Sequence, residues 1–292
     1  MSRLRSWMFV PGNQPRRLEK VKHLPADAVI YDLEDAVPLA EKGRARQLVK
    51  QALRENNGRM QYVRVNDPST PYYAEDLAEM ADRGLSGIML PKAATGEQIL
   101  AVDRELTALE QRRGLLAGSI EIVPLIESAQ GLFHAYEIAS AGARIRRLAF
   151  GSVDFALDIG ATLTKEGTEI LFARSQLVVV SRAAGIEPPI DAVFADVLDR
   201  EGLRRDAQLA RQLGFQGKLV IHPEQLAIVH ACFSPTAEEL EEARIIAAAF
   251  EEALAAGSAS IQVDGKLVDY PVAERARRLL QSVQPFAEQE RE

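Results

Sequence analysis

The feature of this sequence that most constrains its fold is a regular alternation of short strand-like runs with longer helical stretches. Parallel strands that follow one another need a crossover of about a dozen residues or more, usually a helix. Eight such units predict a closed (β/α)8 barrel, because a doubly wound sheet normally uses fewer strands. The eight apolar, β-rich runs are Trp7 to Val10, Ala28 to Leu33, Gln61 to Val65, Gly87 to Leu90, Glu121 to Ile126, Arg147 to Phe150, Ala192 to Phe194 and Lys218 to Ile221.

The chain of 292 residues is longer than eight such units require, and the surplus follows the eighth run. Apolar residues recur at helical spacing from Leu240 to Leu254. The segment from Gly257 to Pro271 predicts a small hairpin or loop, and a final basic helix is expected from Ala273 to Ser282. We therefore expect a catalytic barrel domain, residues 1–232, and a C-terminal extension, residues 233–292.

Composition and charge argue against several classes of function. The formal net charge is -7, and Lys and Arg form no long tract, so we expect no nucleic-acid partner. The apolar runs fall well short of the roughly 20 residues that cross a bilayer. The single cysteine, Cys232, excludes an intrachain disulfide, and no apolar signal stretch follows the first residues. These observations predict a cytoplasmic protein without a membrane partner.

Polar residues gather where the strand-like runs end, which is the face that carries the active site in barrels of this kind. No other face of the predicted barrel collects such a set. The strand-end segments are Pro11-Gly12-Asn13, Asp32-Leu33-Glu34-Asp35, Arg64-Val65-Asn66, Pro91-Lys92, Glu127-Ser128, Gly151-Ser152-Val153-Asp154 and His222-Pro223.

Glu127 and Asp154 follow neighbouring runs, and neighbouring strands lie about 4.8 Å apart, so the two carboxylates can converge on one ion. Carboxylate oxygens suit Mg²⁺, which keeps several waters and completes its octahedron with substrate oxygens. The structural alternative is that each acid only caps the helix that follows it. Spacing by itself supports the two interpretations evenly.

Arg64 ends the third run between apolar neighbours, and its planar guanidinium suits a substrate carboxylate. An internal ion pair with Asp32 or Glu34 is supported equally by the spacing. Asp32, Glu34 and Asp35 together carry too many negative charges for one small ion site. Some of these acids must therefore orient water or pair with Arg64 or Lys92.

His222 ends the eighth run, but a lone histidine at a strand end is more often a hydrogen-bonded structural residue than a general base. We expect the structural role for it. The other histidines have no metal-ligand spacing, and the chain contains neither a Walker-type loop nor a dinucleotide-binding glycine pattern.

Taken in order along the chain, the motifs resemble those of the CitE-like group of the HpcH/HpaI aldolase superfamily, which includes citrate lyase beta subunits, malyl-CoA lyases and citramalyl-CoA lyases. The resemblance runs nearly end to end, and the ordered set is highly specific. The matching motifs are Phe9-Val10-Pro11-Gly12, Asp32-Leu33-Glu34-Asp35-Ala36-Val37, Val63-Arg64-Val65-Asn66, Pro91-Lys92, Ile126-Glu127-Ser128, Gly151-Ser152-Val153-Asp154-Phe155 and Ile221-His222-Pro223-Glu224-Gln225.

The resemblance implies an enzyme that binds Mg²⁺ through Glu127 and Asp154, with Arg64 gripping the carboxylate of a 2-oxo acid. In the acyl-CoA lyases of this group, an aspartate in a C-terminal extension reaches into a neighbouring subunit's site as the acid–base residue. Asp269, in Gly265-Lys266-Leu267-Val268-Asp269, matches that aspartate. The family usually assembles as trimers or dimers of trimers, so we expect a homotrimer or hexamer.

The resemblance also implies a CoA-binding surface on the first strand and its loop. Gln14 stands where some relatives carry a basic residue, which weakens a phosphate contact there, and Arg16 or Arg17 can substitute for it. The implied CoA-contacting residues are Phe9, Arg16, Lys20 and Pro223.

The implied reaction is the retro-Claisen cleavage of a 3-hydroxyacyl-CoA to acetyl-CoA and a 2-oxo acid. Citramalyl-CoA gives pyruvate and malyl-CoA gives glyoxylate, and the short connection after Asp154 favours the citramalyl type. Bound Mg²⁺ supplies the charge that stabilises the hydroxyl oxygen as the carbon–carbon bond breaks. Arg64 then fixes the carboxylate, and Asp269 protonates the enolate at carbon.

Three alternatives stay open. A citrate lyase beta subunit would act on a citryl thioester of an acyl carrier protein within a larger complex; it would need no extension of the Asp269 type, so the extension argues against it. A free-acid aldolase of the wider superfamily would not require a CoA thioester. A non-catalytic metal- and CoA-binding protein would bind its ligands without turning them over.

Overall fold

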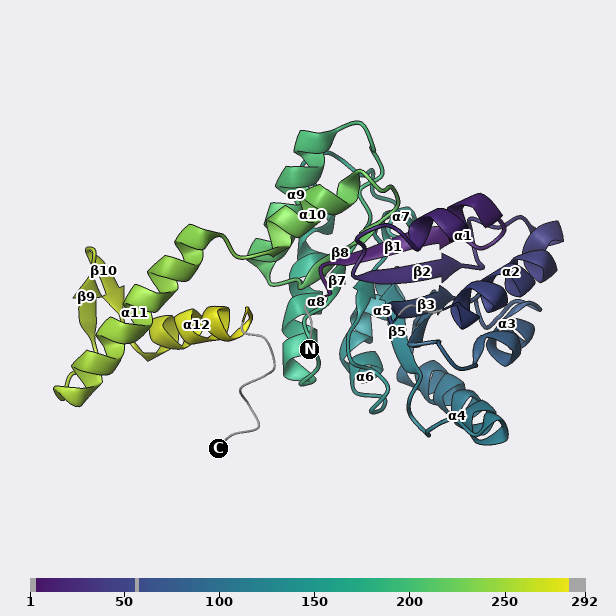
Figure 1. Ribbon diagram of the computed structural model, residues 1–292, viewed down its shortest axis with the longest axis horizontal. Coiled ribbons are helices and arrows are strands. Elements are labelled where there is room, and N and C mark those ends of the chain that lie inside the picture. Colours follow the sequence, from purple (N-terminus) through teal and green to yellow (C-terminus); the bar gives the residue numbers. More distant parts are fainter. Residues whose placement is uncertain (1–3, 56–57, 284–292) are drawn as a thin grey trace. The chain divides into compact units, whose positions relative to one another are not determined.

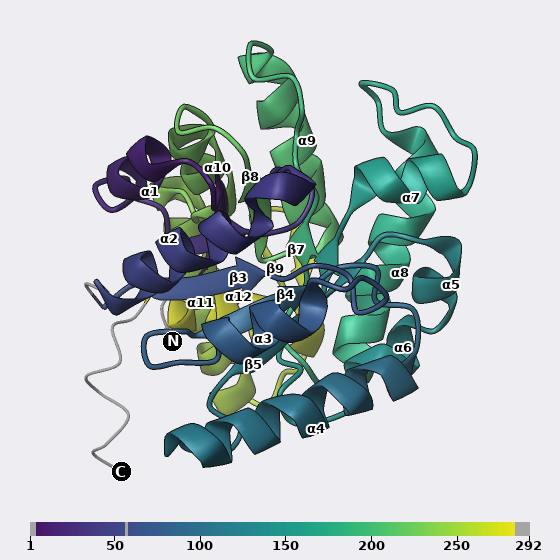
Figure 2. The same ribbon diagram turned by 90° about the vertical axis from the view of Figure 1, so that its right-hand side faces the viewer.

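The computed structural model describes residues 4–55 and 58–283, and its first compact unit, Leu4–Phe233, is a closed barrel of parallel strands. Each strand pairs with the next, and β8 pairs with β1 to close the ring, as Figure 1 and Figure 2 show. The expected (β/α)8 barrel is confirmed. The strands are β1 (Ser6–Pro11), β2 (Ala28–Asp32), β3 (Met60–Arg64), β4 (Gly87–Leu90), β5 (Glu121–Ile126), β6 (Ala149–Phe150), β7 (Ile190–Asp191) and β8 (Gly217–Val220).

Helices connect the strands and lie outside the ring (Figure 2). Helix α4 shows how the sequence sets their ends: the Thr95 side chain accepts a hydrogen bond from the Gln98 backbone N–H at its start, and Gly114 ends it with a φ of 64°. The helices of this unit are α1 (Pro15–Val21), η1 (Leu39–Glu41), α2 (Lys42–Arg54), α3 (Tyr73–Met80), α4 (Gly96–Arg113), α5 (Ala129–Phe133), α6 (Ala135–Ala139), α7 (Ser152–Asp158), η2 (Thr168–Ile170), α8 (Leu171–Ala183), α9 (Arg200–Leu213) and α10 (Gln225–Phe233).

The inside of the barrel is filled with side chains. Trp7, Tyr62, Val123 and Leu219 come from four different strands and form one buried cluster there. The Trp7 and Tyr62 rings lie 4.6 Å apart between centroids. Because the interior is packed and is not a pore, a ligand site has room only at an end of the barrel.

The prediction for the seventh strand was wrong. It was expected at Ala192–Phe194, but β7 lies two residues earlier, at Ile190–Asp191. Sequence reasoning favoured the apolar run, whereas the ladder uses a buried aspartate: Asp191 is opposite Lys218 of β8, and its carboxylate accepts a hydrogen bond from the Lys218 ammonium at 2.5 Å. The sixth strand is also shorter at its N-terminal end than expected.

The described residues from Ser234 to Val283 belong to a second compact unit, the extension. Phe250, which is fully buried, packs against Val268 and Ala273, and its ring meets the Tyr270 ring edge-on at 5.2 Å. The extension therefore has a small apolar core of its own. Its elements are α11 (Ala237–Ala255), β9 (Ile261–Val263), β10 (Lys266–Val268) and α12 (Tyr270–Gln281).

The hairpin of the extension turns at Asp264 and Gly265, which both have positive φ, as a two-residue turn of this kind requires. The final helix starts earlier than the expected Ala273, because Asp269 caps it at Tyr270.

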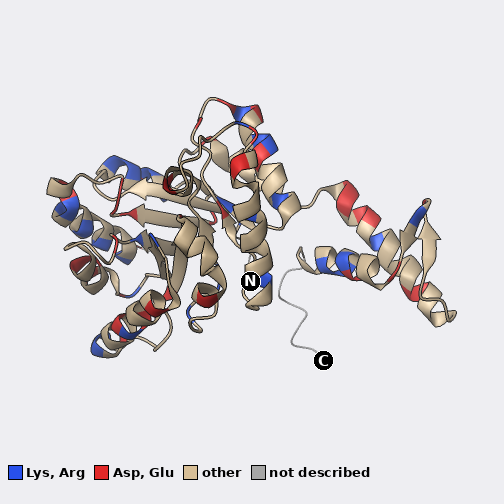
Figure 3. Ribbon diagram, turned by 180° about the vertical axis from the view of Figure 1, so that it is seen from behind, with Lys and Arg blue, Asp and Glu red and all other residues tan. Residues whose placement is uncertain are grey.

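Acidic residues gather along α11, while acidic and basic side chains are interspersed over the barrel helices (Figure 3). Within residues 4–55 and 58–283, no helix has both the length and the apolar character needed to cross a bilayer.

We expect Lys218→Met to lower the free energy of unfolding of the barrel by about 3 kcal/mol, because it removes one partner from a buried ionic cluster. The Lys218 ammonium lies 2.5 Å from carboxylate oxygens of both Asp191 and Asp206, and the Lys218 and Asp191 side chains are fully buried. Urea denaturation measures the effect. The control is Lys165→Met, which breaks an ion pair between Asp199 and an exposed lysine and should cost less than about 1 kcal/mol. Equal stabilities of the two variants would contradict the prediction.

Candidate active site

A cavity of about 510 Å³ lies at the end of the barrel where the carboxyl ends of the strands meet. Its wall has two chemically different parts. The apolar part is formed mainly by Leu125, Phe150, Val193 and Leu219, and the charged residues in the lining are Arg17, Asp32, Asp35, Arg64, Glu127 and Asp154. The structure therefore brings Arg64, Glu127 and Asp154 to one cavity.

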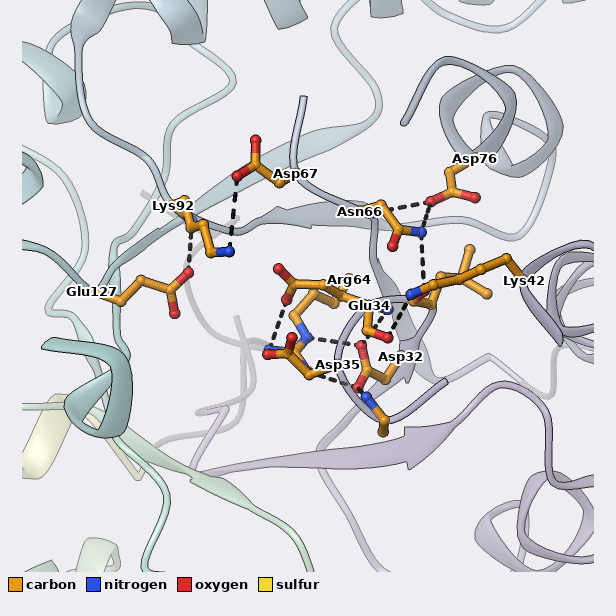
Figure 4. A network of polar contacts seen from close by, with 12 residues as sticks. Asp32, Glu34, Asp35, Lys42, Arg64, Asn66, Asp67, Asp76, Lys92 and Glu127 are labelled. Atoms are coloured by element: carbon orange, nitrogen blue, oxygen red, sulfur yellow. Dashed lines mark hydrogen bonds and ion pairs between the residues drawn. The ribbon is translucent and has the colours of Figure 1, made fainter. Parts of the chain in front are cut away.

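Glu127 follows β5 and is buried. Its Oε1 atom accepts a hydrogen bond of 2.7 Å from the backbone N–H of Lys92, a residue with a positive φ of 50° (Figure 4). A Cβ atom at Gly151 would lie 2.6 Å from Oε2 of the same carboxylate. Only glycine lets the chain after β6 pass so close to Glu127, so the two loops hold the carboxylate between them.

The electrostatic environment of Glu127 fits a bound cation. Burial raises the pKa of Glu127 to about 7, the Lys92 hydrogen bond opposes this shift, and the negative charge of Asp154 adds to it. A buried carboxylate beside a second carboxylate is costly to ionise unless a cation offsets the charge. Carboxylate oxygens are the donors that Mg²⁺ prefers.

Neither carboxylate makes a capping hydrogen bond to the helix that follows it, although the position of Asp154 in the first turn of α7 suits the helix dipole of the structural alternative. The Ser128 side chain caps α5, and no side chain makes a capping hydrogen bond at the start of α7, where Asp154 lies in the first turn. Among the described residues, no group of three or more His, Cys, Asp and Glu side chains is gathered as a metal site. The cavity thus offers a pair of carboxylates, and an ion held there would keep water or substrate oxygens as its other ligands.

Arg64 forms the internal ion pair that the spacing allowed. Its Nε and Nη2 atoms donate to the two oxygens of Asp32, at 2.8 and 2.7 Å, and Nη1 lies 3.0 Å from Glu34 and 3.5 Å from Asp35 (Figure 4). The Phe9 ring lies 5.0 Å from the guanidinium carbon. Arg64 nevertheless lines the cavity, so pairing with Asp32 orients the guanidinium and leaves it facing the ligand space.

The acids after β2 surround Arg64, as one of the sequence-based interpretations expected. Asp32 also accepts backbone hydrogen bonds from Glu34 and Ala36. Burial raises the pKa of Glu34 to about 8 despite the opposing charge of Arg64. Lys92 does not pair with these acids: its ammonium lies 4.0 Å from Asp67.

A second, smaller cavity of about 170 Å³ shares Phe9, Arg17 and Ile221 with the first. Phe9, Lys20 and Pro223, three of the four residues expected to contact CoA, line it. Arg17, the alternative to Arg16, also lines this cavity, whereas Arg16 does not, and the role of Arg16 stays a prediction.

Asp269 and His222 make local structural contacts. Asp269 belongs to the extension, where its Oδ1 atom accepts a hydrogen bond of 3.3 Å from the Val272 backbone N–H at the start of α12. Ring atom Nδ1 of His222 accepts a hydrogen bond of 3.3 Å from the Glu224 backbone N–H. The structural role expected for His222 is consistent with this contact.

Sequence reasoning missed three contributors to the site: the backbone N–H of Lys92, the close approach of Gly151 and the buried ammonium of Lys42. The hydrogen bond that a backbone N–H group donates cannot be predicted from the residue type. Gly151 belongs to the same strand-end motif as Asp154, and only Asp154 of that motif was considered as a site residue. Lys42 lies inside a helical stretch, where a lysine normally predicts a solvent-exposed face.

Comparison with known proteins assigns the family. Residues 5–223 match the family described as HpcH/HpaI aldolase/citrate lyase, and residues 171–282 match the family described as C-C bond lyase of the TIM-barrel fold. The citrate lyase subunit beta of Leuconostoc mesenteroides subsp. cremoris is 38% identical over 278 residues, which cover 94% of this chain and 92% of that protein.

The chain is also similar to a thioesterase and to a protein whose solved structure contains bound ligands. A (3S)-malyl-CoA thioesterase of Cereibacter sphaeroides is 35% identical over 285 residues, covering 97% of this chain and 95% of that protein. The crystal structure of CitE from Mycobacterium tuberculosis in complex with magnesium, acetoacetate and coenzyme A has a TM-score of 0.79 and 29% identity, covering 95% of this chain and 97% of that one. The chain belongs to the HpcH/HpaI aldolase/citrate lyase family, and it is a lyase built on a (β/α)8 barrel.

Proposed function

We propose that this protein is a magnesium-dependent lyase that cleaves a 3-hydroxyacyl-CoA to acetyl-CoA and a 2-oxo acid. The observation that carries this proposal is the pair of adjoining cavities. One presents Arg64 with the carboxylates of Glu127 and Asp154, and the other presents a ring and basic side chains at Phe9, Arg17 and Lys20. The CitE structure from M. tuberculosis, which contains magnesium, acetoacetate and coenzyme A together, supports the same combination of ligands here.

In this proposal Glu127 and Asp154 would hold Mg²⁺, whose charge, when it is bound, would stabilise the developing negative charge on the substrate's hydroxyl oxygen. Arg64 binds the substrate's carboxylate. Asp32 already fixes the plane of the guanidinium, so the Arg64 side chain loses little rotational freedom when the substrate binds. The substrate carboxylate has to compete with Glu34 and Asp35 for Nη1.

Asp269 is the proposed acid–base residue, acting in a neighbouring subunit of a homotrimer or hexamer. As the carbon–carbon bond breaks, the hydroxyl group gives up its proton to solvent and becomes the carbonyl group of the oxo acid. The electron pair of the broken bond passes to the thioester as an enolate, which must take up a proton at carbon. A carboxylic acid can supply that proton. In the reverse direction the same carboxylate would remove a proton from acetyl-CoA.

The apolar wall of the first cavity favours a methyl-bearing oxo acid. Leu125, Val193 and Leu219 offer contact to a methyl group, as in pyruvate, but no partner for a second carboxylate. Among the described residues that line this cavity, Arg17 and Arg64 are the cations, and three acids already surround Arg64. We therefore propose citramalyl-CoA as the preferred substrate, with malyl-CoA next.

Cleavage of a citryl thioester, as by a citrate lyase beta subunit, is the second candidate. The 38% identity to such a subunit favours it. That alignment leaves only 6% of this chain unmatched, far less than the extension from Ser234. The presence of the extension therefore does not argue against this role, contrary to the expectation from the sequence.

A substrate panel tests the proposal. With Mg²⁺, the purified protein is expected to cleave citramalyl-CoA faster than malyl-CoA, methylmalyl-CoA and citryl-CoA, and to leave free citramalate intact. Chelation of divalent ions should abolish turnover, and added Mg²⁺ should restore it. Binding without turnover of any thioester would favour a non-catalytic protein. A rate unchanged by chelation would refute the role of the metal.

Magnesium affinity should weaken as the pH falls below about 7. Protonated Glu127 cannot bind the ion, and its pKa in the metal-free protein is about 7. Binding at pH 6 should therefore release about one proton per ion, whereas binding at pH 8.5 should release almost none. Titration calorimetry in buffers of different ionisation enthalpy measures this number. A proton release that does not change between these pH values would contradict the assignment of Glu127.

Asp269→Asn separates the catalytic role of Asp269 from its structural one. Asparagine is as good an N-cap as aspartate, so α12 should keep its start while the acid–base group is lost. We expect turnover to fall by at least about 100-fold, with binding of Mg²⁺ and pyruvate retained. Asp264→Asn, in the hairpin of the same unit, is the matched control. Undiminished turnover in Asp269→Asn would rule out the acid–base role.

The cytoplasmic location inferred from the single cysteine stays a prediction. Localisation of a tagged chain in its own cell tests it.

A further inference from the structure

The turn after β2, residues 32–37, has two faces that are held by different groups. On one face, the Asp32 carboxylate accepts hydrogen bonds from the backbone N–H groups of Glu34 and Ala36, at 2.9 and 3.2 Å. The same carboxylate binds Arg64. The Glu34 carbonyl accepts a hydrogen bond of 3.0 Å from the Val37 backbone N–H within the turn, and the Leu33 and Glu34 carbonyl groups also accept hydrogen bonds from residues outside it, so the conformation of the turn depends on both sets of contacts.

Lys42, at the start of α2, holds these carbonyl groups. Its ammonium donates to the carbonyl oxygens of Leu33 and Glu34, both at 2.7 Å, and the residue is only 4% exposed (Figure 4). No carboxylate of the described residues lies within ion-pair distance of this ammonium. Burial accordingly lowers the pKa of Lys42. Burying a lysine ammonium that has only backbone carbonyl groups as hydrogen-bond partners costs free energy, so we ask what its two hydrogen bonds do for the turn.

A second donor supports the same turn from the loop after β3. The side-chain amide of Asn66 donates to the Leu33 carbonyl at 2.9 Å and to Asp76 at 2.5 Å. Asp76 in turn accepts a hydrogen bond of 3.1 Å from Arg46. Asn66 is therefore held in place by Asp76 of α3 and, through it, by Arg46 of α2, and both helices lie outside the ligand cavity.

We infer that Lys42 is a positioning residue of the site: by holding the Leu33 and Glu34 carbonyl groups, it aims the acids of the turn at Arg64. Without the ammonium, the Leu33 carbonyl would keep the Asn66 amide as a donor and the Glu34 carbonyl would keep the Val37 N–H, but both would lose a charge-assisted hydrogen bond. The turn would also lose its direct tie to α2 and would shift. Glu34 and Asp35, which lie 3.0 and 3.5 Å from Nη1 of Arg64, would move with it. The guanidinium would then lose the fixed orientation in which it faces the substrate carboxylate.

This inference rests on the proposed function only for the identity of the ligand, a 2-oxo acid. It predicts a selective defect. Arg64 depends on the turn, whereas Glu127 is held by the Lys92 backbone N–H and Asp154 lies on α7. Loss of Lys42 should therefore weaken binding of the oxo acid much more than binding of the metal.

The test compares Lys42→Met with Lys50→Met in the full-length protein. Lys50 lies on the same helix and pairs with Glu79 at 3.7 Å, away from the turn. Titration calorimetry measures the dissociation constants of Mg²⁺ alone and of pyruvate at saturating Mg²⁺. For Lys42→Met we expect the pyruvate constant to rise by about tenfold or more and the Mg²⁺ constant to change by less than about threefold, as for loss of an outer-shell partner. Lys50→Met should match the wild type in both.

Each outcome decides a different point. Unchanged pyruvate binding by folded Lys42→Met overturns this inference and leaves the proposed function intact. Absence of pyruvate binding by the wild type with Mg²⁺ overturns the proposed function and this inference with it. If Lys42→Met does not fold, Lys42→Gln, which can keep one of the two hydrogen bonds, takes its place. An equal loss of both ligands, or failure of both variants to fold, overturns the inference, because Lys42 would then support the fold and not the site.

Discussion

The burial of Glu127 beside Asp154 is the constraint on which the rest of the site depends. The packed barrel interior leaves room for a cavity only where the strands end, and Glu127 is buried there with its pKa raised to about 7. The Lys92 backbone N–H and the close approach of Gly151 keep the carboxylate in place. Two acids that line one cavity, where the charge of Asp154 raises the pKa of Glu127, are stabilised by a cation that offsets their charge, and an oxygen-only donor pair suits a hard divalent ion.

The charges that line the cavity also favour a bound cation. Among the described residues that line it, the cations Arg17 and Arg64 are outnumbered by the acids Asp32, Asp35, Glu127 and Asp154, so the ligand space is negative before anything binds. An anionic oxo acid enters such a space poorly unless a bound ion offsets the charge. The acids after β2 therefore have two effects: they fix the guanidinium, and they make substrate binding depend on the metal.

The sequence predicted the barrel because alternation of strands and helices is a property of residue order, and it predicted Glu127, Asp154 and Arg64 because strand ends converge in a barrel. The misplaced β7 shows where this reasoning stops: Asp191 is tolerated in the ladder because Lys218 of β8 and Arg174 of α8 pair with its carboxylate, and both partners come from other elements. Of the two arginines considered for a phosphate contact, Arg17 lines both cavities, and residue order does not show which of two adjacent helical residues, about 100° apart, faces a cavity. Lys42 depended on backbone carbonyl groups, which residue types do not reveal.

The most direct test of the metal pair is the binding of Mn²⁺, as a spectroscopic substitute for Mg²⁺, followed by electron paramagnetic resonance. The account predicts one site per chain in the wild type and in Asp158→Asn, which changes an exposed acid at the other end of α7 and keeps an oxygen for the hydrogen bond from the Ala129 backbone N–H. It predicts that Asp154→Asn weakens binding by at least about tenfold. Equal Mn²⁺ affinity in Asp154→Asn and the wild type would contradict the assignment of Glu127 and Asp154 as the ligands.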